Sequence, residues 1–411
     1  MKRISAYPVY LILSGADGMI SSVIFTVNMI YQVTIVGLNP LQLVLVGTTL
    51  EATAFIFEIP TGVVADVYSR RLSVIIGYLL IGIGFLVEGL YPFFATVLLA
   101  QLIWGIGYTF TSGALEAWLS DEIGEERAGR GFLRAAQIVQ LTTLVGIVAS
   151  VALGSERVSL PIVVGGVSYV ALGIFLAFFM TEHGFVRRPK EERNSFHAMW
   201  DTFRAGLEMV QRKPMLSTIL GIGLFYGIYS EGFDRLWTPY LLTFTFPVID
   251  GMTTVAWFGL LRAGAILLGI AATEFVRRRV DTTSEPSVRR AMFAISALMV
   301  ATLAGFALAF NFTMAIAAYW AFSLLRQTTH PLFTAWVNQR LDSKVRATVI
   351  SMSSQVDALG QIAGGPVVGV IGTALSLRAA LAASATMLSP VLLLFSRAAR
   401  GDGERAVIVE E

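Results

Sequence analysis

The sequence contains no cysteine and only three histidines. The absence of cysteine excludes disulfides, thiolate metal sites and cysteine nucleophiles. Charged residues are also scarce, at 14% of the chain against about 25% in an ordinary soluble domain. Because 55% of the 411 residues are hydrophobic and the mean hydropathy is +0.70, we expect a polytopic membrane protein and not one or two soluble domains.

The motifs of common enzyme classes are missing as well. There is no HExxH zinc motif, no GxSxG nucleophile elbow and no GxxxxGK[ST] phosphate-binding loop. Without a phosphate-binding loop, this chain alone is not expected to pump at the expense of ATP. The sequence therefore predicts a protein that is not an enzyme and holds no cofactor and no metal.

What the chain does have is a succession of long apolar segments, each of about 20 residues or more and so able to cross a bilayer as a helix. Met1-Lys2-Arg3 is a short basic lead into the first of them, with no small-residue cleavage site after it, so we expect a retained helix. The predicted fold is all-α with twelve transmembrane helices, near 8–33, 41–64, 72–91, 94–118, 134–154, 160–181, 215–243, 253–275, 291–310, 312–336, 345–371 and 374–396.

Lysine and arginine gather in alternate connections between these segments, while the other connections hold little beyond Arg157 and Arg378. Positively charged loops remain on the cytoplasmic side of a membrane. We therefore predict cytoplasmic N- and C-termini in a multi-pass membrane protein.

The connection over 182–214 is much longer than the others and divides the spans six and six. We predict an N-terminal six-helix bundle over 1–185, a cytoplasmic linker over 186–213, a C-terminal bundle over 214–398 and a cytoplasmic tail over 399–411. In the linker, Phe196, Met199, Trp200 and Phe203 recur at helical spacing. This amphipathic helix either lies on the inner membrane surface or packs under the bundle.

The two halves resemble each other. Ala117-Trp118-Leu119 ends the fourth span and Ala335-Trp336-Val337 ends the tenth, and an arginine (Arg130 or Arg346) then enters the next span. Matching features at equivalent positions indicate a duplicated six-helix unit with pseudo-two-fold symmetry.

Polar residues form stripes at helical spacing in the first, fourth, seventh and tenth spans, which symmetry would place around one central cavity. The alternative is that these side chains only make hydrogen bonds between helices. Asp357 is expected to pair with Arg326, and Glu88, near the outer end of its span, to reach water. The candidate substrate and proton cavity comprises Asp17, Asn28, Gln32, Tyr226, Glu231, Asp234, Arg235, Arg262, Arg326, His330 and Asp357.

A second group of charges lies at the cytoplasmic ends of the spans. We predict that it forms a latch that stabilises the state closed to the cytoplasm, while the plain alternative is a topological signal made by the arginines alone. The candidate latch residues are Gly62, Asp66, Arg70, Arg71, Glu116, Asp121, Arg130 and Arg346.

The run Gly62-x-x-x-Asp66-x-x-x-Arg70-Arg71 between spans 2 and 3, with twelve spans and a long central loop, resembles the major facilitator superfamily over the whole chain. The run departs from that family's pattern at Val67, where a base is usual, and at Ser69, where glycine is usual. Glu58-x-Pro60-Thr61-Gly62 and Glu231-Gly232-Phe233-Asp234-Arg235 look like a bacterial branch that is drug-efflux-like. The fifth span nevertheless lacks the Gly-Pro pair that drug/proton antiporters of the family often carry.

The resemblance to a bacterial branch of the superfamily implies secondary active transport by alternating access, in the bacterial inner membrane. We expect proton-coupled efflux of small amphipathic or cationic compounds of the multidrug type, with acids and aromatics such as Trp237, Trp257 and Trp320 near the cavity. The alternatives are uptake of a nutrient, sugar or organic anion, lipid flipping on the same fold, or a receptor or scaffold that transports nothing. The expected partners are a small-molecule substrate, protons and the lipid bilayer but no nucleic acid, and the chain is expected to be a monomer.

Overall fold

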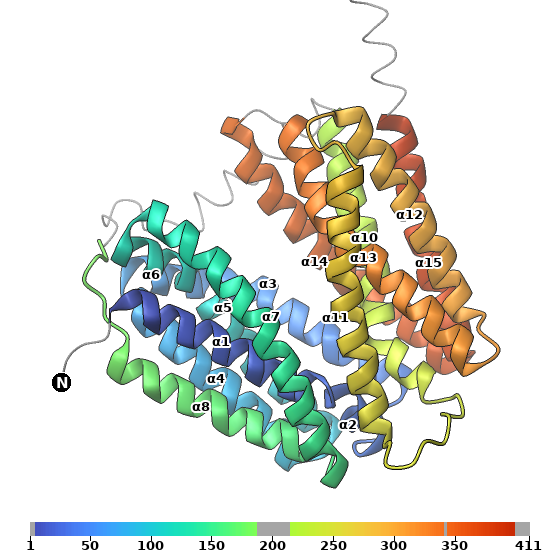
Figure 1. Cartoon of the computed structure of the whole chain (residues 1–411), viewed down its shortest axis with the longest axis horizontal. Coiled ribbons are helices and arrows are strands. Elements are labelled where there is room, and N and C mark those ends of the chain that lie inside the picture. Colours follow the sequence, from blue (N-terminus) through green and yellow to red (C-terminus); the bar gives the residue numbers. More distant parts are fainter. Residues whose placement is uncertain (1–4, 187–213, 341–342, 399–411) are drawn as a thin grey trace, which may run out of the picture. The chain divides into compact units, whose positions relative to one another are not determined.

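The computed structural model describes residues 5–186, 214–340 and 343–398, and within them every regular element is a helix (Figure 1). The predicted amphipathic helix of the linker and the cytoplasmic tail lie outside the described residues. In the described part of the chain the architecture is therefore all-α, as the composition predicts.

Helices of the first half follow one another through short joints. Two of these joints need a positive φ that glycine adopts without strain: Gly113 (φ 69°) and Gly124 (φ 83°). Gly113 separates the fifth and sixth helices, and Gly124 the sixth and seventh. The helices are α1 (Ala6–Phe25), α2 (Asn28–Thr34), α3 (Pro40–Val67), α4 (Arg70–Leu90), α5 (Phe94–Thr111), α6 (Ala114–Ile123), α7 (Glu125–Glu156) and α8 (Leu160–Phe179).

The second half begins at Pro214, where proline is tolerated because the first turn of a helix needs no N–H partner. Its last helix is followed, after a turn at Ser389, by further helical residues to Ala398. The helices are α10 (Pro214–Leu241), α11 (Thr254–Arg279), α12 (Glu285–Ala307), α13 (Phe312–Arg340), α14 (Ser343–Ala374) and α15 (Leu377–Leu388).

Ten helices of the described residues are long and apolar enough to cross a membrane. Each of the twelve predicted spans overlaps helical structure, but α10 and α13 are not among the ten. Both carry a polar stripe, with Glu231 and Asp234 on α10 and Arg326 on α13. The count of twelve spans and the cytoplasmic termini remain predictions.

The chain divides into two compact units that do not coincide with a single cut at the linker. Unit 1 comprises 1–38, 49–198 and 248–262, and unit 2 comprises 39–48, 199–247 and 263–411. The first turns of α3 thus belong to unit 2, and the first turns of α11 belong to unit 1. The predicted division into bundles at 186–213 stays a prediction.

The helix pairings within the two units repeat. In unit 1, α1 packs on α7 and α8, and α4 packs on α5 and α8. In unit 2, α10 packs on α14 and α15, and α12 packs on α13 and α15. Spans 1, 3, 4, 5 and 6 therefore have the same neighbours as spans 7, 9, 10, 11 and 12, which agrees with the duplication that the sequence indicates.

Small residues allow close contacts between helices in both units. On α7, Ser150 donates its hydroxyl hydrogen to the Val23 carbonyl of α1 at 2.6 Å, and a Cβ added at Gly146 would collide with the Met19 carbonyl. On α14, a Cβ at Gly364 would collide with the Ile228 carbonyl of α10. Side chains as small as hydrogen let two backbones approach, which is how helices associate tightly in lipid.

Candidate functional site

Within unit 2, the helices α10, α13 and α14 enclose a cavity of about 320 Å³. Tyrosine and serine come from α10, arginine, histidine and threonine from α13, and an aspartate and a glutamine from α14. The lining residues are Gly223, Tyr226, Tyr229, Ser230, Arg326, Thr329, His330, Phe333, Thr334, Val337, Ile350, Ser353, Ser354, Asp357 and Gln361. The mixture of aromatic rings and a few convergent polar groups is typical of a small-molecule site.

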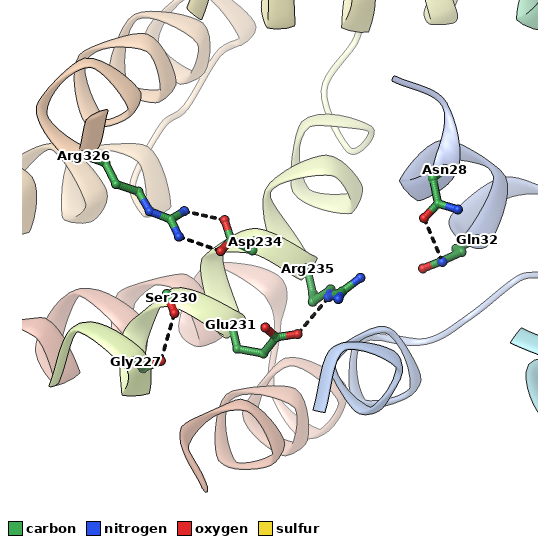
Figure 2. A network of polar contacts seen from close by, with 8 residues as sticks. All are labelled: Asn28, Gln32, Gly227, Ser230, Glu231, Asp234, Arg235 and Arg326. Atoms are coloured by element: carbon green, nitrogen blue, oxygen red, sulfur yellow. Dashed lines mark hydrogen bonds and ion pairs between the residues drawn. The ribbon is translucent and has the colours of Figure 1, made fainter. Parts of the chain in front are cut away.

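The cation of this cavity, Arg326, is held by Asp234 of α10 (Figure 2). Its two terminal nitrogens donate to both carboxylate oxygens, and the Nη2–Oδ2 distance is 2.7 Å. The guanidinium carbon also lies 5.9 Å from the ring centroids of Tyr229 and Phe233, within the range of cation–π attraction. The side chains are 34% and 41% exposed, so the pair remains open to a ligand or to protons.

Asp357 is the second acid of the cavity, and its partner differs from the expected one. The sequence predicts a pair with Arg326, but the two oxygens of Asp234 already occupy that guanidinium. Asp357 instead accepts a hydrogen bond of 2.8 Å from the Gln361 amide, one turn along α14. If both acids are ionised, the one arginine and two carboxylates leave the cavity with one net negative charge.

The aromatic side of the cavity comes from α10 and α13. The ring of Tyr226 meets Phe333 edge-on at 6.4 Å and Tyr229 at 6.3 Å. A 2.9 Å hydrogen bond between the hydroxyls of Tyr226 and Ser296 on α12 fixes the tyrosine. These rings offer a flat apolar surface beside the acids.

Of the predicted cavity residues, Tyr226, Arg326, His330 and Asp357 line this cavity and Asp234 holds its arginine. The other predicted members of unit 2, Glu231 and Arg235, form their own ion pair at 2.8 Å (Figure 2).

Glu231 is buried, at 3% exposure, and glycine at Gly47 and Gly365 leaves room beside its side chain. The carboxylate and the guanidinium therefore lie in direct contact inside unit 2.

Four of the predicted cavity residues belong to unit 1, and Asp17 and Arg262 are two of them. Asp17 on α1 accepts a 3.0 Å hydrogen bond from the Tyr169 hydroxyl of α8. The ring of Tyr169 stacks on that of Tyr78, so the residue that donates to Asp17 is itself fixed by aromatic packing. Arg262 lies on α11 in the segment assigned to unit 1.

Asn28 and Gln32, the other predicted cavity residues of unit 1, are buried and contact an acid of a neighbouring helix. They are 3% and 0% exposed and donate to Glu88 of α4 at 2.8 and 2.7 Å. Glu88, expected to reach water, is fully buried. Glu88 thus accepts a hydrogen bond from each of the two amides. The polar stripe on the first span does not reveal that a neighbouring helix supplies this acceptor.

The predicted latch residues gather at one end of unit 1. Arg70 forms a 2.5 Å ion pair with Asp121 of α6 and lies 4.0 Å from Asp66. Arg71 donates its side chain to the Ala177 carbonyl at 2.5 Å, and its backbone N–H to a carboxylate oxygen of Glu182 at 2.9 Å. Within unit 1, the basic pair therefore ties α4 to α6 and to the end of α8.

The remaining latch candidates are less engaged. Arg130 pairs with Glu126 at 3.7 Å on an open surface, where such pairs contribute little. Glu116 is exposed, and a Cβ at Gly62 would meet nothing within 4 Å. The side chain of Arg346 lies outside the described part of the chain.

Sequence reasoning missed the residues whose role depends on a neighbouring helix. Gln361 and Gln101 carry no charge that would single them out, and aromatic residues such as Tyr229 and Phe333 are also expected in ordinary apolar packing. The spacing of Asp357 and Gln361, four residues apart on one helix, is the signal that was present. Among the described residues, no group of three histidines or acids could hold a metal ion.

Comparisons with known proteins identify the relatives of this chain. The family model described as Major Facilitator Superfamily matches residues 9–352. An uncharacterized MFS-type transporter of Bacillus subtilis (strain 168), YxaM, is 26% identical over 363 residues, which are 87% of each chain.

Solved structures of transporters also resemble the fold of this chain. The nucleoside transporter NupG aligns with a TM-score of 0.76 at 14% identity, over 96% of this chain and 99% of that one. A bacterial homolog of the human lysosomal transporter Spinster, inward-facing and unoccupied, gives 0.73 at 14% identity over 96% of each chain. A POT family transporter in complex with a thioalcohol-conjugated peptide gives 0.71 at 13% identity, again over 96% of each. At such identities these likenesses establish a shared fold and nothing finer.

Proposed function

The chain belongs to the Major Facilitator Superfamily, and we propose that it is a proton-coupled exporter of small amphipathic cations that works by alternating access. The predicted superfamily fold, the multi-pass membrane location and the assignment as a transporter are confirmed by the family match and the structural neighbours. The substrate class, the direction and the coupling ion are the proposal.

The observation that carries the proposal is the charge distribution of the unit 2 cavity. Arg326 is already neutralised by both oxygens of Asp234, so the carboxylate of Asp357 is the charge that a ligand meets. A cation beside the rings of Tyr226 and Phe333 gains both a carboxylate and aromatic faces. An anion would have to displace Asp234 from the arginine before it gained anything.

Proton coupling follows if a proton and a cationic substrate compete for Asp357. Burying the ionised carboxylate alone in a low-dielectric cavity is costly, so either occupant stabilises the site. The two occupants exclude each other because each neutralises the same charge. When the transporter alternates between its two faces, an inward proton gradient then drives the substrate outward.

Transport in proteoliposomes tests the proposal with tetraphenylphosphonium as the lipophilic cation. Protons flow through an antiporter from the compartment of lower pH. An imposed pH gradient is therefore expected to accumulate the probe in that more acidic compartment. Asp357→Asn is expected to lower this accumulation by about tenfold or more, because the neutral side chain no longer discriminates between proton and cation. Glu156→Gln, an exposed carboxylate at the end of α7, is the matched control and should transport normally.

Wild-type accumulation by Asp357→Asn would contradict the proposal, and transport measured in inside-out vesicles determines its direction.

The alternative is uptake of a polar ring compound, which the hydroxyls of Ser353, Ser354 and Thr334 favour because they can bind neutral polar groups. NupG is a nucleoside transporter by its description. Saturable uptake of a nucleoside, without competition by tetraphenylphosphonium, would support this second function instead.

A further inference from the structure

Asp357, the acid that the unit 2 cavity presents to a ligand, is held by two separate contacts. Its backbone lies against α10, since a Cβ added at Gly227 would stand 2.0 Å from the Asp357 carbonyl oxygen. Its carboxylate accepts a 2.8 Å hydrogen bond at Oδ2 from Nε2 of Gln361. Both Asp357 and Gln361 line the cavity. The first contact fixes the place of the acid, and the second fixes the orientation of its carboxylate.

The spacing along α14 explains the contact between the acid and the amide. Side chains four residues apart lie one above the other on a helix face, and they lean toward the start of the helix. Gln361 therefore reaches back one turn to Asp357. An ionised carboxylate only accepts hydrogen bonds, so the amide nitrogen faces it and forms a charge-assisted bond with one of its oxygens.

The other carboxylate oxygen, Oδ1, is left open. Apart from Gln361, no residue in the described part of the chain donates a hydrogen bond to Asp357. The terminal nitrogens of Arg326, the cation of the cavity, donate to Asp234 instead. A ligand in the cavity thus meets a carboxylate with one oxygen engaged and one oxygen able to accept a hydrogen bond.

We propose that Gln361 is a positioning residue of the cation site and that the open Oδ1 of Asp357 selects protonated amines over cations that carry no N–H. This inference deepens the proposed function and rests on it. A protonated amine donates its N–H to Oδ1 in a short, charge-assisted hydrogen bond. A quaternary ammonium or phosphonium ion has no such hydrogen, and its substituents keep the charge farther from the oxygen, which weakens the attraction.

The same arrangement gives the proton and the substrate a common atom. A proton on Asp357 adds to Oδ1 at the lowest cost, because Oδ2 then keeps its hydrogen bond from Gln361. The N–H of an amine needs that same oxygen. The two occupants therefore exclude each other by contact as well as by charge, which is the competition that exchange of a proton for a substrate requires.

Equilibrium dialysis of the purified full-length protein at neutral pH tests the selectivity with a matched pair of probes. One probe is N,N-dimethyl(naphthylmethyl)amine, which is protonated at this pH, and the other is its N-methyl quaternary salt. The two share the ring and the charge and differ in the N–H. The wild-type protein is expected to bind the amine about tenfold or more tightly than the salt, the scale on which a hydrogen bond to a charged group contributes.

Gln361→Leu removes the donor and nearly keeps the shape of the side chain. It is expected to lower the ratio of the two affinities by about threefold or more, because the amine must then fix a carboxylate that rotates. The affinity for the quaternary salt should stay unchanged, whereas a merely structural effect would alter both affinities together. Gln140→Leu, an exposed carboxamide on α7, is the control and should keep the wild-type ratio.

Equal affinities of the two probes in the wild-type protein overturn the inference, whether or not Gln361→Leu folds. A wild-type ratio in folded Gln361→Leu overturns the positioning role of the amide. Asp357→Asn separates these failures from a failure of the proposed function. If both probes bind the wild type equally and neither binds Asp357→Asn, the cation site stands without selectivity for an N–H. If neither probe binds the wild type, the proposed cation site fails and the inference fails with it.

Discussion

At the scale of single residues, the ion pair between Arg326 and Asp234 is the most sensitive contact of the candidate cavity. It is a bidentate contact between α13 and α10, and it leaves the carboxylate of Asp357 as the charge presented to a ligand. Removing one member leaves the other charge without its partner in a partly buried place. The cost exceeds what the pair itself contributes, because the remaining ion keeps its desolvation penalty.

We therefore predict that Asp234→Asn lowers stability by about 1–2 kcal/mol, below the range for a sealed pair because the two side chains are 34% and 41% exposed. The double variant Asp234→Asn with Arg326→Gln should recover most of this loss, since no unpaired ion remains. Thermal unfolding of the purified single and double variants measures both. If the losses of the two single variants simply add in the double variant, the pair is not coupled.

At the scale of elements, the contact between α10 and α14 depends on the absence of side chains. Gly360 and Gly364 lie against the backbone of α10, at Leu224 and Ile228. Asp234 of α10 in turn pairs with Arg326 of α13. The glycine contacts and this ion pair therefore hold together the three helices that enclose the cavity.

Gly364→Ala is predicted to destabilise the protein by about 1–3 kcal/mol, because the new methyl group collides with backbone atoms that cannot rotate away. Gly305→Ala on α12 is the matched control. A Cβ at Gly305 meets nothing within 4 Å, and alanine favours the helix, so its Tm should equal or exceed that of the wild type. Equal Tm values for the two variants would show that the close approach does not limit stability.

At the scale of the whole molecule, the lack of cysteine becomes an experimental advantage. A single introduced cysteine is the only thiol of the chain, so its labelling rate reports access to one place. Ser354 lines the cavity and is exposed, which makes Ser354→Cys a suitable reporter. The predicted latch of Asp66, Arg70 and Asp121 then becomes testable as a change in cytoplasmic access.

On the Ser354→Cys background, Asp66→Asn is predicted to raise the rate of labelling by a membrane-impermeant maleimide from the cytoplasmic side. The reason is that loss of an acid beside Arg70 weakens the state closed to the cytoplasm and shifts the population toward the open one. Glu125→Gln, an exposed acid in the first turn of α7, is the control. An unchanged rate in Asp66→Asn would show that the cluster only marks topology.

Much of the fold is predictable because a membrane leaves few choices. Every backbone polar group must be satisfied within its own helix, so long apolar segments report helices directly, and the predicted spans overlap helical structure throughout the described residues. The site was only partly predictable. Tyr226, Arg326, His330 and Asp357 do line a cavity, but the stripe of Asn28 and Gln32 turned out to face Glu88.

The sequence by itself determined the class of this protein: an all-helical membrane chain with an internal duplication and the charged loop of a transporter superfamily. Those features are local or periodic, and they depend on hydrophobicity and on spacing along one helix. Only the tertiary structure decided which polar side chains meet. In it, Arg326 pairs with Asp234, Gln361 donates to Asp357, and Glu88 is buried among three amides. The physical reason is that spacing along one helix shows which side chains lie on a common face of that helix. The partner of each side chain belongs to another helix, whose rotation and depth are set by packing.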